Sequence, residues 1–85
     1  MQQNWTETEG KLFKIFKFNT FKEAVEWMNF CVSEIDLADH HPNWENIYNS
    51  VIVKLYTHTT NSITEKDYSL AELLDKKYFE YRVRK

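Results

Sequence analysis

The sequence predicts an α+β fold of two layers, an antiparallel four-stranded sheet with two long helices packed on one face. Aromatic residues make up 16 % of the 85 residues and apolar residues 42 %, which is typical of a folded domain. The apolar pattern changes along the chain in the order strand, helix, hairpin, helix. No linker or low-complexity tract interrupts this order, so one domain over residues 1–85 is expected.

The first expected strand covers residues 11–18 (KLFKIFKF), where lysine is mixed with aromatic and aliphatic residues. This mixture predicts an amphipathic strand at the edge of the sheet. Thr20 and Glu23 then have the spacing of a capping box, which marks a helix start. Apolar residues follow at helical spacing: Phe21, Ala24, Val25, Met28, Cys31, Val32 and Ile35. Pro42 disfavours helical geometry at the residue before it, so the helix should end near Asp39.

Residues 44–59 (WENIYNSVIVKLYTHT) predict a hairpin with Asn49 and Ser50 at its turn. The second strand should bury one face, which carries Val51, Val53 and Leu55. Thr64 and Asp67 have the spacing that starts a second helix. That helix should reach close to the C-terminus, with apolar residues at Leu70, Ala71, Leu74 and Tyr78.

Three further apolar residues of the first helix, Trp27, Phe30 and Leu37, lie outside its main apolar stripe. They give the helix more apolar surface than one contact with a sheet requires. A homodimer or homotetramer would cover this surface, and we expect one. A wide buried face within a single small domain explains the same pattern.

Composition excludes several classes of function. The net charge of −2 lacks the attraction that nucleic-acid binders use, so no direct nucleic-acid contact is expected. The first ten residues are polar and acidic, and no apolar run reaches the length of a membrane span. The single cysteine, Cys31, cannot form an internal disulfide and falls in the apolar helical pattern. A cytoplasmic protein without membrane contact is therefore expected.

Two of the three histidines stand together in residues 39–44 (DHHPNW), before the single proline. Histidine near a helix C-terminus is favoured by the unpaired carbonyls there, which is one interpretation. A zinc site is a second, but adjacent side chains diverge and no paired-ligand spacing exists. General acid–base catalysis is the third, because histidine exchanges protons near neutral pH, as a dehydration requires. From the residues alone, these interpretations stay open.

The spacing D-x-x-x-H-H-P-x-W-x-N-x-Y, followed by further spaced matches, resembles the pterin-4a-carbinolamine dehydratase family. The matching residues here are Asp36, His40, His41, Pro42, Trp44, Asn46, Tyr48, Val51, Leu55, Thr57, His58, Thr64 and Asp67. Upstream matches extend the resemblance over most of the chain: Leu12, Lys14, Phe16, Phe18 and Phe21. Asn61 stands where the family usually has glycine, and asparagine tolerates the positive φ of such a turn. Lys14 replaces a usual arginine and loses its fork-shaped hydrogen bonding.

The resemblance implies a hydro-lyase without metal or cofactor, which removes water from 4a-hydroxytetrahydropterin (4a-hydroxytetrahydrobiopterin). The product, quinonoid dihydropterin, would be recycled for aromatic amino acid hydroxylases, a step of tetrahydrobiopterin biosynthesis. It further implies that His40, His41 and His58 line the pterin site. We expect His41 and His58 to transfer protons, and His40 to bind and orient the substrate.

Four other residues are expected to bind or orient substrate, or to support the site. Asp67 either fixes the tautomer of a histidine or caps the second helix. Pro42 fixes the direction of the loop, Trp44 belongs to the core or forms a platform for the substrate, and Asp36 completes the motif. Strict alternation from Val51 places position 58 on the sheet face opposite Leu55, so the strand ends or twists there, or the site opens at the sheet edge.

The resemblance also leaves two alternatives open. Some members of the family act as dimerisation cofactors for a homeodomain transcription factor, so a non-catalytic role as a transcriptional cofactor is one. A member that acts in another pterin pathway, such as molybdopterin metabolism, is the other. The full set of three histidines in the family spacing favours catalysis.

Overall fold

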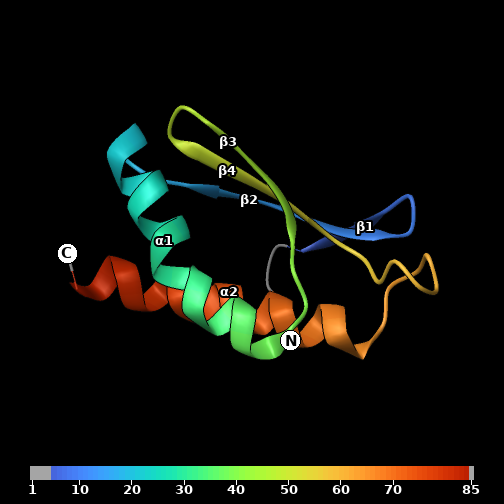
Figure 1. The fold of residues 1–85 in the computed structure, drawn as a ribbon. Helices are drawn as coiled ribbons and strands as arrows, with labels where there is room; N and C mark the ends of the chain where they lie inside the picture. The colour runs from blue at the N-terminus through green and yellow to red at the C-terminus, as the bar shows by residue number, and fades with distance from the viewer. Residues whose placement is uncertain (1–4, 85) are drawn as a thin grey trace.

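The structure, a computed structural model, describes residues 5–84. Its elements in chain order are β1 (Thr6–Thr8), β2 (Lys11–Lys17), α1 (Phe21–Ala38), β3 (Asn43–Ile47), β4 (Ser50–Leu55) and α2 (Glu65–Arg84). Neighbouring strands are antiparallel in the order β1-β2-β4-β3, and both helices lie on one side of the sheet (Figure 1). The predicted α+β architecture is confirmed. Residues 1–4 of the acidic N-terminal stretch lie outside the described residues, as does Lys85.

The strand β2 lies inside the sheet, between β1 and β4, so its prediction as an edge strand is wrong. The edge is formed by β1, a three-residue strand of polar residues, Thr6–Thr8. Because β1 has no apolar alternation, the fourth strand could not be located from the sequence pattern. Lys14 of β2 is accommodated by an ion pair, in which its Nζ lies 2.7 Å from Oδ1 of Asp75 on α2.

The buried face of α1 differs in part from the predicted stripe. It consists of Ala24, Trp27, Cys31 and Ile35. Phe21 and Val32, expected within it, are 53 % and 44 % exposed. Trp27 replaces them because α1 packs against α2 as well as the sheet: the indole contacts the rings of Phe16 on β2 and Tyr78 on α2.

The surplus apolar surface of α1 is largely covered within the chain. Trp27 is fully buried, and Phe30 lies against Tyr81 of α2, with the Lys77 Nζ 3.6 Å from its ring centre. Leu37, in contrast, is 86 % exposed. The argument from Trp27 and Phe30 for a covering partner is therefore lost, and the homodimer or homotetramer stays a prediction.

The predicted helix starts and ends are confirmed. The Thr20 hydroxyl accepts a hydrogen bond from the Glu23 N–H (3.1 Å) at the start of α1, and Asp39 ends the helix in the left-handed region at φ 54°. The hairpin of β3 and β4 is also present, but its turn consists of residues 48 and 49. Ser50, predicted in the turn, is the first residue of β4 and pairs with Ile47.

Candidate functional site

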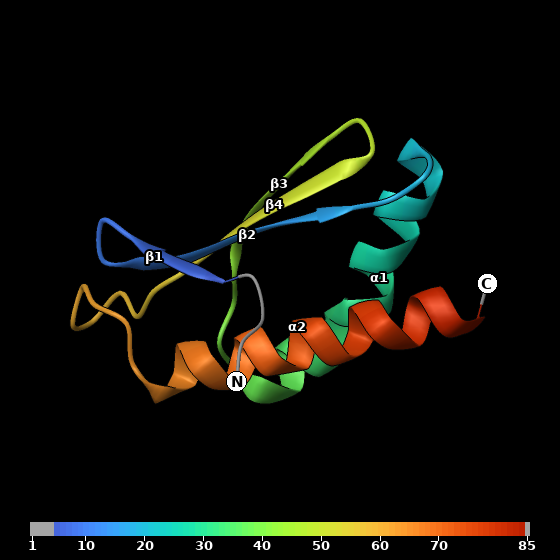
Figure 2. The ribbon, with the colours of Figure 1, turned by 180° about the vertical axis from the view of Figure 1, so that it is seen from behind.

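Two segments carry the three histidines, and both meet the start of α2. His40 and His41 follow α1, whereas His58 lies in the segment between β4 and α2. Figure 2 shows this segment at the end of the sheet opposite the β3–β4 turn, from where it runs down to α2. The strand β4 ends at Leu55, so of the alternatives for position 58 the structure shows the one in which the strand ends before it.

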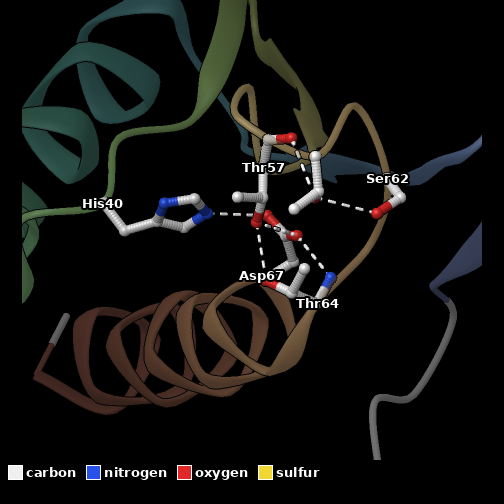
Figure 3. A network of polar contacts seen from close by, with 6 residues as sticks. His40, Thr57, Ser62, Thr64 and Asp67 are labelled. Carbon is white, nitrogen blue, oxygen red and sulfur yellow. Dashed lines mark hydrogen bonds and ion pairs between the residues drawn. The ribbon is translucent and has the colours of Figure 1, made fainter.

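Asp67, in the first turn of α2, is the centre of a buried polar network (Figure 3). Its side chain is fully buried, and its Oδ1 lies 2.7 Å from Nε2 of His40. Its Oδ2 accepts hydrogen bonds from the Thr57 hydroxyl (2.9 Å) and the Thr64 backbone N–H (2.8 Å). Asp67 therefore performs both expected tasks, because it caps the start of α2 and also binds a histidine.

This network defines the tautomer of His40. A carboxylate only accepts hydrogen bonds, so Nε2 of His40 must carry the hydrogen that it shares with Asp67. In the neutral imidazole, the lone pair of Nδ1 is then left for a donor from a ligand. Only 13 % of the His40 side chain is exposed, so burial and the contact with Asp67 hold its ring in one position.

His40 also lines an open groove between the C-terminal end of α1 and the first turns of α2. The groove has a volume of about 530 Å³, which is within the usual range for small-molecule sites. Polar groups of Asp39, Lys66 and Ser69 border it, together with the apolar Leu70. It offers a concave surface beside an oriented imidazole.

His41 has a different partner and a different environment. Its Nε2 lies 3.1 Å from Oδ1 of Asp36 on α1, and the two side chains are 58 % and 70 % exposed. An exposed pair of this kind contributes at most about 1 kcal/mol to stability. Asp36 can thus orient His41 while the imidazole remains accessible to a ligand.

His58 is exposed and contacts the ring of Tyr56 in a tilted arrangement, with ring centres 4.5 Å apart. It starts a short loop that is closed by an isolated bridge between Thr57 and Ser62. Asn61 in this loop has φ 53°, so the predicted positive φ at this position is confirmed. Asparagine therefore adopts the left-handed conformation that this turn needs.

The structure pairs His40 with Asp67, His41 with Asp36, and His58 with Tyr56, so the three imidazoles have separate partners. Their backbones are nonetheless tied to one network. His41 directly follows His40, which binds Asp67, and His58 directly follows Thr57, which donates a hydrogen bond to Asp67. Because consecutive Cα atoms are ~3.8 Å apart, the backbones of His41 and His58 each lie one residue from this network.

Pro42 and Trp44 follow the two adjacent histidines in the chain, and both have a structural role there. Pro42 is partly buried between the end of α1 and β3. Trp44 packs against the core, with its ring 6.1 Å from that of Trp27, so its interpretation as a core residue is favoured over that of a platform.

Two residues of the network were missing from the predicted site, namely Thr57 and Thr64. Their hydroxyl oxygens are 2.6 Å apart. Thr57 is only 7 % exposed and continues the buried alternation of Val53 and Leu55. A hydroxyl at a buried position of that alternation was the signal for a polar partner inside the protein.

Within residues 5–84, no group of three or more His, Cys, Asp or Glu side chains is arranged to hold a metal ion. In the same part of the chain, no helix is both long enough and apolar enough to span a membrane.

The chain is similar in sequence and in fold to known proteins. A family model described as pterin 4 alpha carbinolamine dehydratase matches residues 1–77. A Prochlorococcus marinus protein named "Putative pterin-4-alpha-carbinolamine dehydratase" is 46 % identical over 71 residues, which cover 84 % of this chain and 74 % of that protein. The crystal structure of a "transcriptional coactivator/pterin dehydratase" from Brucella melitensis has a TM-score of 0.84 and 32 % identity, over 89 % of this chain and 83 % of that one.

A further solved structure is similar in fold alone. It is a pterin dehydratase-like protein described as a RuBisCO assembly factor in the alpha-carboxysome. Its identity is 19 % and its TM-score 0.70, over 87 % of this chain and 86 % of that one.

Proposed function

Because the chain belongs to the pterin-4a-carbinolamine dehydratase family, we propose that it dehydrates 4a-hydroxytetrahydropterin to quinonoid dihydropterin. The observation that carries this proposal is the pair of His40 and the fully buried Asp67, which orients one imidazole beside a groove of small-molecule size. A second histidine follows directly in the chain, and a third is attached to the same network through Thr57.

The reaction needs one acid and one base. The C4a–O bond breaks as the hydroxyl is protonated and leaves as water, while a ring nitrogen loses a proton and a new double bond forms. The proton given to the leaving hydroxyl is replaced by the proton taken from nitrogen, so the protein ends with the same number of protons. Histidine suits both steps because it exchanges protons near neutral pH.

We assign the proton transfers to His41 and His58, whose exposed rings a bound pterin can approach. His40 binds and orients the substrate, since its Nε2 is already occupied by Asp67 and its Nδ1 can accept a hydrogen bond from a ring N–H. Asp36 supports His41, and Pro42 fixes the path from α1 into β3.

This activity would recycle the pterin cofactor of aromatic amino acid hydroxylases in the cytoplasm. The protein would act as a homodimer or homotetramer and need no metal or cofactor.

The experiment is stopped-flow measurement of the loss of 4a-hydroxytetrahydropterin absorbance. Wild type should accelerate dehydration, and His41→Ala and His58→Ala should each slow the catalysed rate by more than about tenfold, as is typical of acid–base groups. Thr59→Ala, at the exposed neighbour of His58, is the matched control and should retain the wild-type rate. Circular dichroism establishes that all four proteins are folded. Wild-type rates in both histidine variants would overturn the assignment of roles.

The name of the Brucella relative supports a second candidate, a binding role in transcription. Exposed apolar side chains on α1, above all Leu37, would then contact a partner. Folded wild type that leaves the dehydration rate unchanged, but binds a transcription factor through Leu37, would favour this candidate over catalysis.

A further inference from the structure

Thr57 directly precedes His58 in the chain, and its side chain lies beside Asp67, the partner of His40 (Figure 3). Its hydroxyl donates to Oδ2 of Asp67 (2.9 Å), and Oδ1 of the same carboxylate holds Nε2 of His40 (2.7 Å). The backbone of Thr57 closes the loop that starts with His58, because its N–H donates to the carbonyl of Ser62 (2.8 Å). Thr57 is thus linked to His40 through the carboxylate of Asp67, and to His58 through the backbone.

The hydrogen bonds of Thr57 have a defined direction. A hydroxyl has one hydrogen, and the Asp67 carboxylate can only accept it. The 2.6 Å contact with the Thr64 hydroxyl must therefore run from Thr64 to Thr57. Thr57 is 7 % exposed and Asp67 is fully buried, so water cannot easily replace these bonds. Without the Thr57 hydroxyl, the carboxylate loses one of its donors and the Thr64 hydroxyl loses its acceptor.

We propose that Thr57 is a positioning residue, which fixes the tautomer and ring orientation of His40 through Asp67. Without the Thr57 hydroxyl, Oδ2 of Asp67 keeps only the Thr64 N–H (2.8 Å), so the carboxylate is held less tightly and offers Oδ1 to His40 in a less defined geometry. Misplacement of a substrate-binding group by about 1 Å can cost on the order of 100-fold in rate. The effect on catalysis rests on the proposed function, but the tautomer of His40 can be measured without substrate.

Three variants separate the hydroxyl from the shape of the side chain. Thr57→Val keeps the shape and removes the hydroxyl, whereas Thr57→Ser keeps the hydroxyl and removes a methyl group. Thr59→Val makes the same change as the first variant at an exposed position, and serves as the matched control. If Thr57→Val proves unfolded by circular dichroism, Thr57→Cys, with a weaker donor, takes its place.

The first measurement is long-range ¹H–¹⁵N NMR of the imidazole rings in the free proteins. His40 should be the Nε2–H tautomer in wild type, Thr57→Ser and Thr59→Val, and a mixture of tautomers in Thr57→Val. The second is the pH profile of kcat and KM for dehydration. Thr57→Val should lower kcat about tenfold with an altered pH profile, and Thr57→Ser should stay within about twofold of wild type.

An unchanged His40 tautomer in folded Thr57→Val would overturn the proposal. Equal losses of kcat in Thr57→Val and Thr57→Ser would overturn it too, since the methyl group and not the hydroxyl would then matter. If wild type has no dehydratase activity, but Thr57→Val alone changes the tautomer, the proposed function fails and the positioning role of Thr57 stands.

Discussion

Replacement of Asp67 by alanine should destabilise the protein strongly, although the side chain it removes is small. Asp67 is fully buried and is the acceptor for three donors, namely Nε2 of His40, the hydroxyl of Thr57 and the backbone N–H of Thr64. The hydroxyl can turn to the Thr64 oxygen, 2.6 Å away, and His40 can change its tautomer. The backbone N–H of Thr64 cannot turn to another acceptor, so the substitution leaves it without a hydrogen bond near the protein interior.

The cost can be worked from these contacts. A buried donor left without a partner costs about 1–3 kcal/mol, and the loss of hydrogen bonds to a charged group adds a similar amount. We therefore expect a loss of ~3 kcal/mol in the free energy of unfolding. For a chain of 85 residues, about 4–8 °C is lost per kcal/mol, so the Tm should fall by roughly 10–25 °C.

Asp36→Ala is the matched control, because Asp36 also pairs with a histidine but is exposed. Its loss should cost less than ~1 kcal/mol. Thermal unfolding followed by circular dichroism measures both variants against wild type. A Tm for Asp67→Ala within about 3 °C of wild type would show that the network contributes little to stability and refute this reasoning.

Three further predictions concern the core, the thiol and a helix cap. Trp27→Ala should lose about 3–5 kcal/mol in urea unfolding because the indole is fully buried, whereas Leu37→Ala, at an exposed site, should change stability by less than ~0.5 kcal/mol. Burial raises the pKa of the Cys31 thiol to about 12, so native protein at pH 8 should react with a disulfide reagent at least about 100-fold more slowly than urea-unfolded protein. The pKa of Cys31 in the folded protein lies above the unfolded value of 9.0, so its contribution to stability is complete below pH 9 and is lost as the pH rises toward 12. Urea titrations at pH 8 and 10.5 should therefore show a lower free energy of unfolding at the higher pH. Thr20→Ala should cost ~1 kcal/mol in the same assay, because it removes the N-cap of α1; an unchanged midpoint would argue against that cap.

The elements with strong local signals could be predicted from the sequence. The capping pair Thr20 and Glu23 and the left-handed Asp39 bound α1 as expected, since caps depend on residues close in the chain. The alternation of β4 gave the correct buried face for the same reason. In contrast, β1 has three polar residues and forms only through pairing with β2, so no local pattern marks it.

The burial of Trp27 could not be predicted from α1 alone, because it depends on the second neighbour, α2, and on the ring of Tyr78. The site shows the same limit. The resemblance named His40 and Asp67, but their 2.7 Å contact joins residues 27 positions apart and needs the fold. The alternatives for Asp67, helix cap or histidine partner, proved compatible because its two oxygens serve different donors.

The most direct test of the account is the dehydration rate of wild type compared with the double variant His41→Ala/His58→Ala, both in excess over 4a-hydroxytetrahydropterin in a stopped-flow instrument. Both side chains are exposed, so the double variant should fold. We predict that wild type accelerates the loss of substrate and that the double variant returns to the rate measured in buffer. A folded double variant that still accelerates the reaction as wild type does, or a folded wild type that leaves the rate at the buffer value, would contradict it.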